Sequence, residues 1–143
     1  MEVQVNTSIE ILAPASVIWD ILIDFDRYPE WNHLFVSVKG TPQLGATLTV
    51  QMSRNMRFRP KVIQLRQKNE LTWEGKLGLG CFFRGKHSFR IEPTANGCLF
   101  THTERFTGLV AVVFPRGRYR RRLTENFERF NQALKDRAEQ AAQ

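Results

Sequence analysis

The sequence has few of the features that mark secreted or membrane proteins. Its only two cysteines, Cys81 and Cys98, lack metal-binding spacing and fit reduced thiols. The longest apolar run, Leu109–Phe114, is much shorter than the roughly 20 residues of a membrane-spanning helix. The first residues alternate polar and apolar side chains, which is unlike a secretory signal. These absences predict a cytoplasmic protein.

Motifs of several familiar catalytic and cofactor sites are also missing. No G-x-S-x-G nucleophile motif is present, and neither cysteine has an obvious base beside it. Gly75, Gly78 and Gly80 do not match a nucleotide-binding loop, because no helix is expected after them. The sequence therefore predicts no bound cofactor.

Acidic residues are scarcer than basic ones, 14 against 21, so the formal net charge is +7. The densest basic stretch, RGRYRRR, contains Arg116, Arg118, Arg120, Arg121 and Arg122. Such a cluster can attract anionic lipid or nucleic acid, but a solvated helix face is the commoner reason for one. Because no nucleic-acid-binding motif accompanies it, we expect no specific nucleic-acid binding. Transient contact with an anionic membrane stays as an alternative.

The length and the uniform composition predict a single domain over residues 1–143. Residues 3–11 alternate like a half-buried strand, and residues 14–23 have an apolar side that suits a helix. The next stretch, DFDRYPEWNHLF, reads as a short helical turn broken at Tyr28–Pro29. Its many aromatic rings either close the end of the core or contact a ligand, and the sequence leaves both interpretations open.

The middle of the chain reads as a series of antiparallel strands. Alternation predicts short strands within residues 34–40, 47–52, 57–62 and 71–77. A tight turn at Gln67–Lys68 would place Val62 opposite Trp73, with both side chains on the apolar face.

Two further strands flank TANG, residues 94–97, which is a good turn sequence. A four-residue loop would pair Phe89 with His102 and His87 with Glu104. A two-residue turn at Asn96–Gly97 would pair Phe89 with Glu104 instead. Either turn gives the same inner face, which consists of His87, Phe89, Ile91, Phe100, His102, Glu104 and Phe106.

The chain ends in a long helix that is predicted to begin near residues 114–117 and to run towards Ala138. One stripe of this helix is apolar and contains Tyr119, Leu123, Phe127, Phe130 and Leu134. This helix is the element expected to cover the inner face of the sheet. One helix does not fill a sheet of six or seven strands, so the pattern predicts space for a ligand cavity between them.

Three blocks of the sequence resemble the START-like superfamily, also called SRPBCC or the polyketide cyclase/dehydratase and lipid-transport group. They are IEILAPASVIWDILIDFDRYPEWN, GKHSFRIEPTANGCLFTHTERFTG and FERFNQALKDRAE, and the second is similar to small bacterial cyclase-like members. The resemblance implies an α+β helix-grip fold. That fold has a seven-stranded antiparallel sheet around a long C-terminal helix, with two short helices after the first strand. It also implies a cavity for apolar or amphipathic small molecules, and it places Tyr28, Pro29 and Trp31 near the cavity mouth.

The inner face of the final hairpin supplies the candidate polar groups. An inward carboxylate among phenylalanines is costly unless it is paired or protonated, and an imidazole across the strand pair is a suitable partner. His87 and Glu104 are therefore either a general acid–base couple or a structural pair that orients a ligand. With His102 they would supply two imidazoles and a carboxylate, but side chains on a flat strand pair diverge, so no metal site is expected.

The leading hypothesis is a protein that binds a small hydrophobic or aromatic ligand, lipid-like or polyketide-like, between the sheet and the terminal helix. The predicted ligand-binding residues are Trp31, Met52, Phe58, Trp73, His87, Phe89, Phe100, His102, Glu104, Phe106, Leu123, Phe127 and Phe130. One alternative is a cyclase or dehydratase in which His87 and Glu104 transfer a proton. Another is a binder of anionic membranes or polyanions through the arginine cluster. The sequence leaves open a monomer or a homodimer.

Overall fold

The computed structural model describes residues 2–52, 56–77, 83–108 and 116–143, with only the backbone described for Leu77, Phe83 and Arg116. Its elements are β1 (Glu2–Ile11), α1 (Ala15–Ile23), the 3-10 helix η1 (Phe25–Glu30), β2 (Phe35–Lys39), β3 (Thr49–Met52), β4 (Met56–Phe58), β5 (Lys61–Arg66), β6 (Glu70–Leu77), β7 (Phe83–Pro93), β8 (Cys98–Thr107) and α2 (Arg116–Ala141). Cys81, Gly78, Gly80 and the apolar run 109–114 lie outside the described residues.

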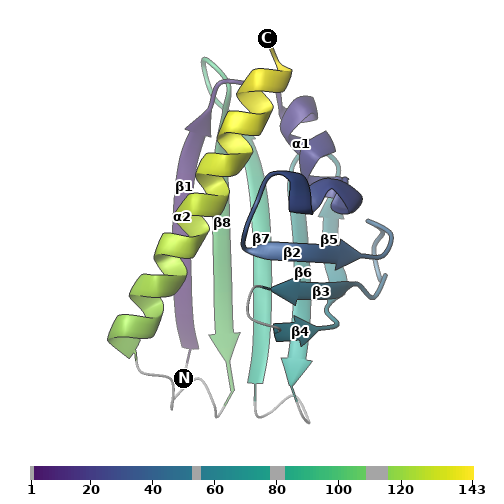
Figure 1. Ribbon diagram of the computed structural model, residues 1–143, viewed down its shortest axis with the longest axis vertical. Helices are drawn as coiled ribbons and strands as arrows, with labels where there is room; N and C mark the ends of the chain where they lie inside the picture. The colour runs from purple at the N-terminus through teal and green to yellow at the C-terminus, as the bar shows by residue number, and fades with distance from the viewer. Residues whose placement is uncertain (1, 53–55, 78–82, 109–115) are drawn as a thin grey trace.

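The described strands form two antiparallel sheets. The larger has the order β1-β8-β7-β6-β5, and the smaller has the order β2-β3-β4. Figure 1 shows α2 lying diagonally across β1 and β8, while the small sheet crosses the other strands. The sequence predicted that the long helix alone covers the inner face. The structure shows that the small sheet covers part of it as well. Phe35 of β2 also packs there, with ring centroids 5.5 Å from Trp73 and 5.1 Å from His87.

The α+β helix-grip fold is confirmed, but the predicted number of strands was one too low. The segment expected as one strand over residues 57–62 is divided into β4 and β5. Pro60 stands between them and has no backbone N–H to donate to a strand ladder. The chain therefore leaves one sheet at this proline and enters the other.

Val62 is opposite Trp73 as predicted, but Arg66 pairs with Glu70, so the turn has three residues instead of two and the register shifts between Val62 and Gln64. Of the two registers left open for the final hairpin, the structure has the one that pairs Pro93 with Cys98, so its loop has four residues. Gly97, the last residue of this loop, lies against the end of β1. A Cβ atom there would lie 2.2 Å from the carbonyl oxygen of Ile11, so only glycine fits against the end of β1.

The core lies between the large sheet and its two covers. From α2, the predicted stripe contributes Leu123, Phe127, Phe130 and Leu134, all of which are buried. Tyr119, in the first turns of the helix, is 37% exposed. Among the described helices, none is both long and apolar enough to pass through a membrane.

The aromatic stretch after α1 forms η1 and packs its rings into the core. Tyr28 is buried, and its hydroxyl donates to the carbonyl of Leu22. The Asn32 side chain donates to the Tyr28 carbonyl and accepts from the Phe35 backbone, both at 2.8 Å. The half-buried Trp31 has its ring centroid 5.0 Å from that of Phe130. These contacts favour the interpretation that the rings close the core.

Candidate functional site

Three strands bring the polar side chains of the inner face together. β7 and β8 place His87 opposite Glu104 and Phe89 opposite His102. β1 adds Thr7 beside His102 on the other edge of β8. Because strand side chains alternate between faces, these positions all point to the interior. The face predicted from the sequence is therefore the face that the structure buries.

Five of these side chains form a continuous hydrogen-bonded chain, here called the buried relay: Glu104, His87, His102, Asn131 and Thr7. Glu104 Oε2 lies 2.8 Å from His87 Nδ1, and His87 Nε2 lies 2.6 Å from His102 Nε2. His102 Nδ1 is 2.9 Å from Asn131 Oδ1, which belongs to α2. The relay thus joins the helix to the sheet through polar contacts.

The direction of these hydrogen bonds follows from one backbone carbonyl. The carbonyl of His102 can only accept, so the Thr7 hydroxyl donates to it at 3.0 Å. Thr7 Oγ1 then accepts from Asn131 Nδ2 at 2.9 Å, which turns Asn131 Oδ1 towards His102. Because an amide oxygen only accepts, His102 Nδ1 carries a hydrogen.

His102 is neutral and accepts a hydrogen bond from His87. Burial lowers the pKa of His102 well below its ordinary value, and the nearby His87 charge lowers it further, against the opposing effect of the Asn131 hydrogen bond. With its hydrogen on Nδ1, a neutral His102 has a lone pair on Nε2. The Nε2–H of His87 therefore donates across the 2.6 Å contact.

His87 and Glu104 share one further proton. It is either on His87 Nδ1, which gives an imidazolium beside a carboxylate, or on Glu104 Oε2, which gives two neutral groups. Both forms have zero net charge, and they differ by movement of the proton along one 2.8 Å contact. A pair of this kind can form a hydrogen bond with a bound molecule, or it can transfer a proton to or from that molecule.

The relay meets solvent mainly at Glu104. The side chain of Glu104 is 15% exposed, that of His87 is 3% exposed, and His102 is fully buried. The charge of Glu104 reaches Tyr119 on α2, whose pKa is raised by burial and by this carboxylate. Since Glu104 belongs to the inner face, solvent reaches it through an opening into the interior.

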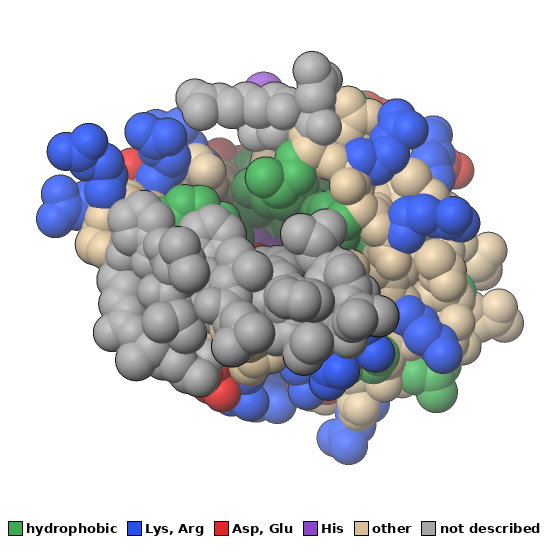
Figure 2. Space-filling model, turned by 90° about the horizontal axis from the view of Figure 1, so that it is seen from below, with side chains coloured by type: hydrophobic (Ala, Val, Ile, Leu, Met, Phe, Trp, Pro, Cys, Tyr) green, Lys and Arg blue, Asp and Glu red, His purple; other side chains and the backbone are tan. Residues whose placement is uncertain are grey.

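Figure 2 shows this end of the molecule hollowed, with hydrophobic side chains gathered in the hollow and Lys and Arg side chains around the face. Figure 1 places the first turns of α2, the end of β8 and the start of β7 at this end. The described residues near it include Phe58, whose ring would be 3.4 Å from a Cβ atom at Gly75. Glu104 lies near the end of β8, which is at this end of the molecule, and the name "hollow" refers below to this opening.

Most of the predicted ligand-contacting rings pack against one another. Phe127 stacks on His102 with centroids 4.0 Å apart, and Trp73 stacks on His87 at 5.5 Å. The predicted residues that are exposed by less than a tenth are Trp73, His87, Phe89, Phe100, His102, Phe106, Leu123, Phe127 and Phe130. Those that are more exposed are Trp31, Met52, Phe58 and Glu104. Trp31 directly follows η1, and Figure 1 shows η1 away from the end where α2 begins.

The family model for polyketide cyclase / dehydrase and lipid transport matches residues 2–139. The chain belongs to this family. No curated protein matches the sequence significantly. The predicted resemblance to the START-like superfamily and the predicted fold are thereby confirmed, and hydrophobic-ligand binding is consistent with this family.

Solved structures share the family fold at low identity. A START superfamily protein from Mycobacterium smegmatis is 20% identical, with a TM-score of 0.74 over 96% of this chain and 98% of that one. A point mutant of norcoclaurine synthase from Thalictrum flavum is 14% identical, with a TM-score of 0.74 over 100% of this chain and 98% of that one. The di-domain aromatase/cyclase StfQ of the steffimycin biosynthetic pathway is 13% identical, with a TM-score of 0.80 over 99% of this chain and 52% of that one.

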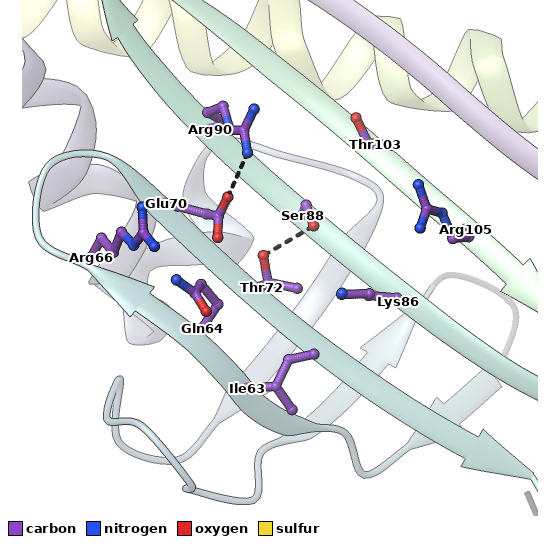
Figure 3. A pocket seen from close by; sticks show the side chains of 10 residues that line it. All are labelled: Ile63, Gln64, Arg66, Glu70, Thr72, Lys86, Ser88, Arg90, Thr103 and Arg105. Atoms are coloured by element: carbon purple, nitrogen blue, oxygen red, sulfur yellow. Dashed lines mark hydrogen bonds and ion pairs between the residues drawn. The ribbon is translucent and has the colours of Figure 1, made fainter.

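In the present protein, a second concavity lies on the outer face of the large sheet, opposite the relay. It has a volume of about 360 Å³ and lies over β5, β6, β7 and β8. Figure 3 shows its lining, in which Arg90 binds Glu70 at 3.0 Å and Thr72 donates to Ser88 at 3.0 Å. Because its lining is mainly polar and basic, it does not suit an apolar ligand, and it is separate from the relay.

Sequence reasoning missed two members of the relay, although both left a signal. Thr7 is the one polar residue at the inward positions of the β1 alternation. Asn131 lies four residues after Phe127 and three before Leu134, so it shares their buried helix face. Buried polar residues on apolar faces are informative because they require partners.

Proposed function

We propose that this protein binds a small hydrophobic or aromatic molecule in the hollow, with Glu104 at the inner, polar end of the site. The observation that carries the proposal is an apolar opening that leads to an inward-facing carboxylate. Ligand sites in proteins commonly combine apolar walls with a few fixed polar groups. Membership of a family whose model is described by cyclase, dehydrase and lipid-transport activities supports the same reading.

The relay supports the proposal because it fixes the polar end before a ligand arrives. Its hydrogen bonds hold His87 in one orientation, and His87 holds Glu104. A group that is already oriented loses little conformational freedom when a ligand binds. The stacked rings behind it provide a rigid wall rather than an open cavity.

Binding is tested with the uncharged fluorescent probe N-phenyl-1-naphthylamine. Its fluorescence should rise on binding, and native mass spectrometry or solvent extraction of the purified protein should show whether an apolar molecule co-purifies. Phe58→Arg places a charge at the hollow and should weaken probe binding. Leu44→Arg is the matched control, because Leu44 is 64% exposed in the loop between β2 and β3. No saturable probe binding by the natural protein would refute the proposal.

A second candidate function is proton-transfer catalysis. The 2.8 Å contact between His87 and Glu104 favours it, because the shared proton lies at the end of the relay that solvent reaches. In this case Glu104 would accept a proton from a carbon next to a carbonyl group, and His87 would stabilise the carboxylate.

This catalytic reading is tested by hydrogen–deuterium exchange at the methyl group of 2-acetonaphthone in deuterated buffer, followed by NMR. The natural protein should accelerate the exchange, and Glu104→Gln should abolish the acceleration while leaving probe binding measurable. Equal exchange rates with and without protein would exclude this activity for aryl ketones and leave the binding function.

The arginines at the start of α2 support the membrane alternative. Arg118, Arg120, Arg121 and Arg122 are exposed in the described structure, at the same end as the hollow. Such a cluster beside an apolar opening suits transient contact with an anionic membrane.

A further inference from the structure

Two glycines face each other on the inner face, next to the relay. Gly75 of β6 is the direct partner of Gly85 of β7, one position along the sheet's inner face from the pair Trp73 and His87. Two adjacent interior positions therefore have no side chain. Side chains from neighbouring elements lie over both positions, Phe58 over Gly75 and Glu104 with Phe106 over Gly85, at the end of the sheet where α2 begins.

The backbone does not explain these glycines. The positive-φ glycines of the described residues are Gly40, Gly45 and Gly108, and the register runs without a shift through both Gly75 and Gly85. A Cβ atom at Gly75 would lie 3.4 Å from the Phe58 ring and 3.8 Å from Pro60, which is ordinary contact. Glycine weakens a strand, and where no bulge requires it, it often marks the close approach of a ligand.

Gly85 instead makes room for the carboxylate of Glu104. A Cβ atom at this position would lie 3.2 Å from Glu104 Oε1 and 3.7 Å from the Phe106 ring. The carboxylate therefore lies over β7, with Oε2 bound to His87. Oε2 is the Glu104 oxygen that bonds to His87, and Oε1 is the oxygen that lies towards Gly85.

Oε1 acts as a hydrogen-bond acceptor in both forms of the His87–Glu104 pair. In one form it belongs to a carboxylate, and in the other the acid proton is on Oε2, which leaves Oε1 as a carbonyl oxygen. The pair has zero net charge in both forms. A cationic ligand would therefore add an uncompensated buried charge, and a carboxylate ligand would bring a second acceptor against Oε1.

Resting on the proposed function, we infer that Glu104 Oε1 and Gly85 select ligands whose inner end is an uncharged hydroxyl donor. The matching chemical class is an apolar alcohol or phenol, and apolar carboxylates are rejected. An aromatic body is expected for such a ligand, because the Phe58 ring lies over Gly75 and the Phe106 ring lies with the Glu104 carboxylate over Gly85.

The test compares naphthalenes that differ in one group. Dissociation constants for 2-naphthol, 2-methoxynaphthalene and 2-naphthoate are measured at pH 7 by displacement of N-phenyl-1-naphthylamine. Since 2-methoxynaphthalene has no donor, 2-naphthol should bind about tenfold more tightly, the usual effect of one hydrogen bond to a charged group. The naphthoate should bind more weakly than both.

Two variants locate the selectivity. Gly85→Ala, which crowds Oε1, and Glu104→Gln, which presents an amide, should each remove most of the preference for naphthol over the methyl ether. Gly117→Ala is the control, because a Cβ atom there would meet nothing within 4 Å. Probe binding by each variant shows that the protein is folded.

The outcomes separate the two proposals. Equal binding of naphthol and its methyl ether, or tighter binding of naphthoate, overturns the selectivity while the proposed binding function stands. A preference for naphthol that survives in both Gly85→Ala and Glu104→Gln also overturns it, because the donor then binds elsewhere. If neither the probe nor any naphthalene binds, the proposed function fails and this inference fails with it.

Discussion

At the scale of single residues, the proton positions in the site depend on groups that a ligand does not touch. Thr7 and Asn131 fix which nitrogen of His102 carries hydrogen, and His102 in turn fixes the donor of His87. Removing one member leaves its neighbour buried without a partner. The cost of such a loss is the desolvation penalty of the stranded group rather than the modest net value of one hydrogen bond.

We expect Thr7→Val to lower the free energy of unfolding by about 1–3 kcal/mol, because the Asn131 amide then has no acceptor for its hydrogen. Urea denaturation measures this change. Thr103→Val is the matched control, because Thr103 bonds to Asn6 on the outer, exposed face and should change stability by less than about 0.5 kcal/mol. Equal effects of the two substitutions would contradict the role given to Thr7.

Stability should also fall as the pH falls below about 6.5, the ordinary value for histidine. The folded-state pKa of His102 is lowered by burial, so in this range the unfolded chain binds more protons than the folded one. His102→Gln should reduce the slope. The carboxyls of Glu30 and Glu139 have lowered pKa values, because Arg137 and Lys135 bond to them, and they contribute at more acidic pH.

Urea midpoints of both proteins between pH 5 and 8 check this prediction. A slope that is identical in the natural protein and in His102→Gln would show that another group carries the pH dependence.

At the scale of elements, the sequence predicted what depends on local patterns. Alternation located the strands, turn residues constrained the final hairpin, and the apolar stripe located α2. It did not predict that β2, β3 and β4 form a separate sheet, because that arrangement depends on how Pro60 redirects the chain in three dimensions. The inward direction of His87 and Glu104 was predictable from alternation. Their direct pairing required the four-residue loop, and the extension of the relay through Asn131 required the position of α2.

The arginines of α2 give a prediction at the same scale. If they contact anionic lipid, sedimentation with vesicles that contain phosphatidylserine should decrease steeply as salt is raised, because charge attraction is screened. Replacing Arg120, Arg121 and Arg122 by serine should abolish the binding. Replacing the exposed residues Arg66, Lys68 and Lys86 by serine removes the same charge elsewhere and is the control. Equal loss in both variants would indicate net charge rather than this cluster.

At the scale of the whole molecule, the inner face of the large sheet has two different covers. α2 covers β1 and β8, and the small sheet brings Phe35 over β6 and β7. Between them the rings and the relay are buried, and the hollow lies at the end seen in Figure 2. The molecule thus combines a packed interior with an opening at one end.

The contact between helix and sheet should depend strongly on Phe127, which is buried and stacks on His102. We expect Phe127→Ala to lower the free energy of unfolding by about 3–5 kcal/mol, since the cavity left by a large core ring is only partly filled. Glu125→Ala, on the exposed side of α2, should change it by less than about 0.5 kcal/mol. Urea denaturation distinguishes the two, and a small effect of Phe127→Ala would mean that the interior repacks readily.

The backbone carbonyl of His102 is present whatever side chains surround it, so the orientation of the relay does not depend on the residue at its solvent end. The residue at position 104 can therefore be substituted while the hydrogen bonds among the other relay residues are retained. A single codon change there would give relatives with a different chemical preference on an unaltered scaffold, and such divergence could proceed without refolding the core.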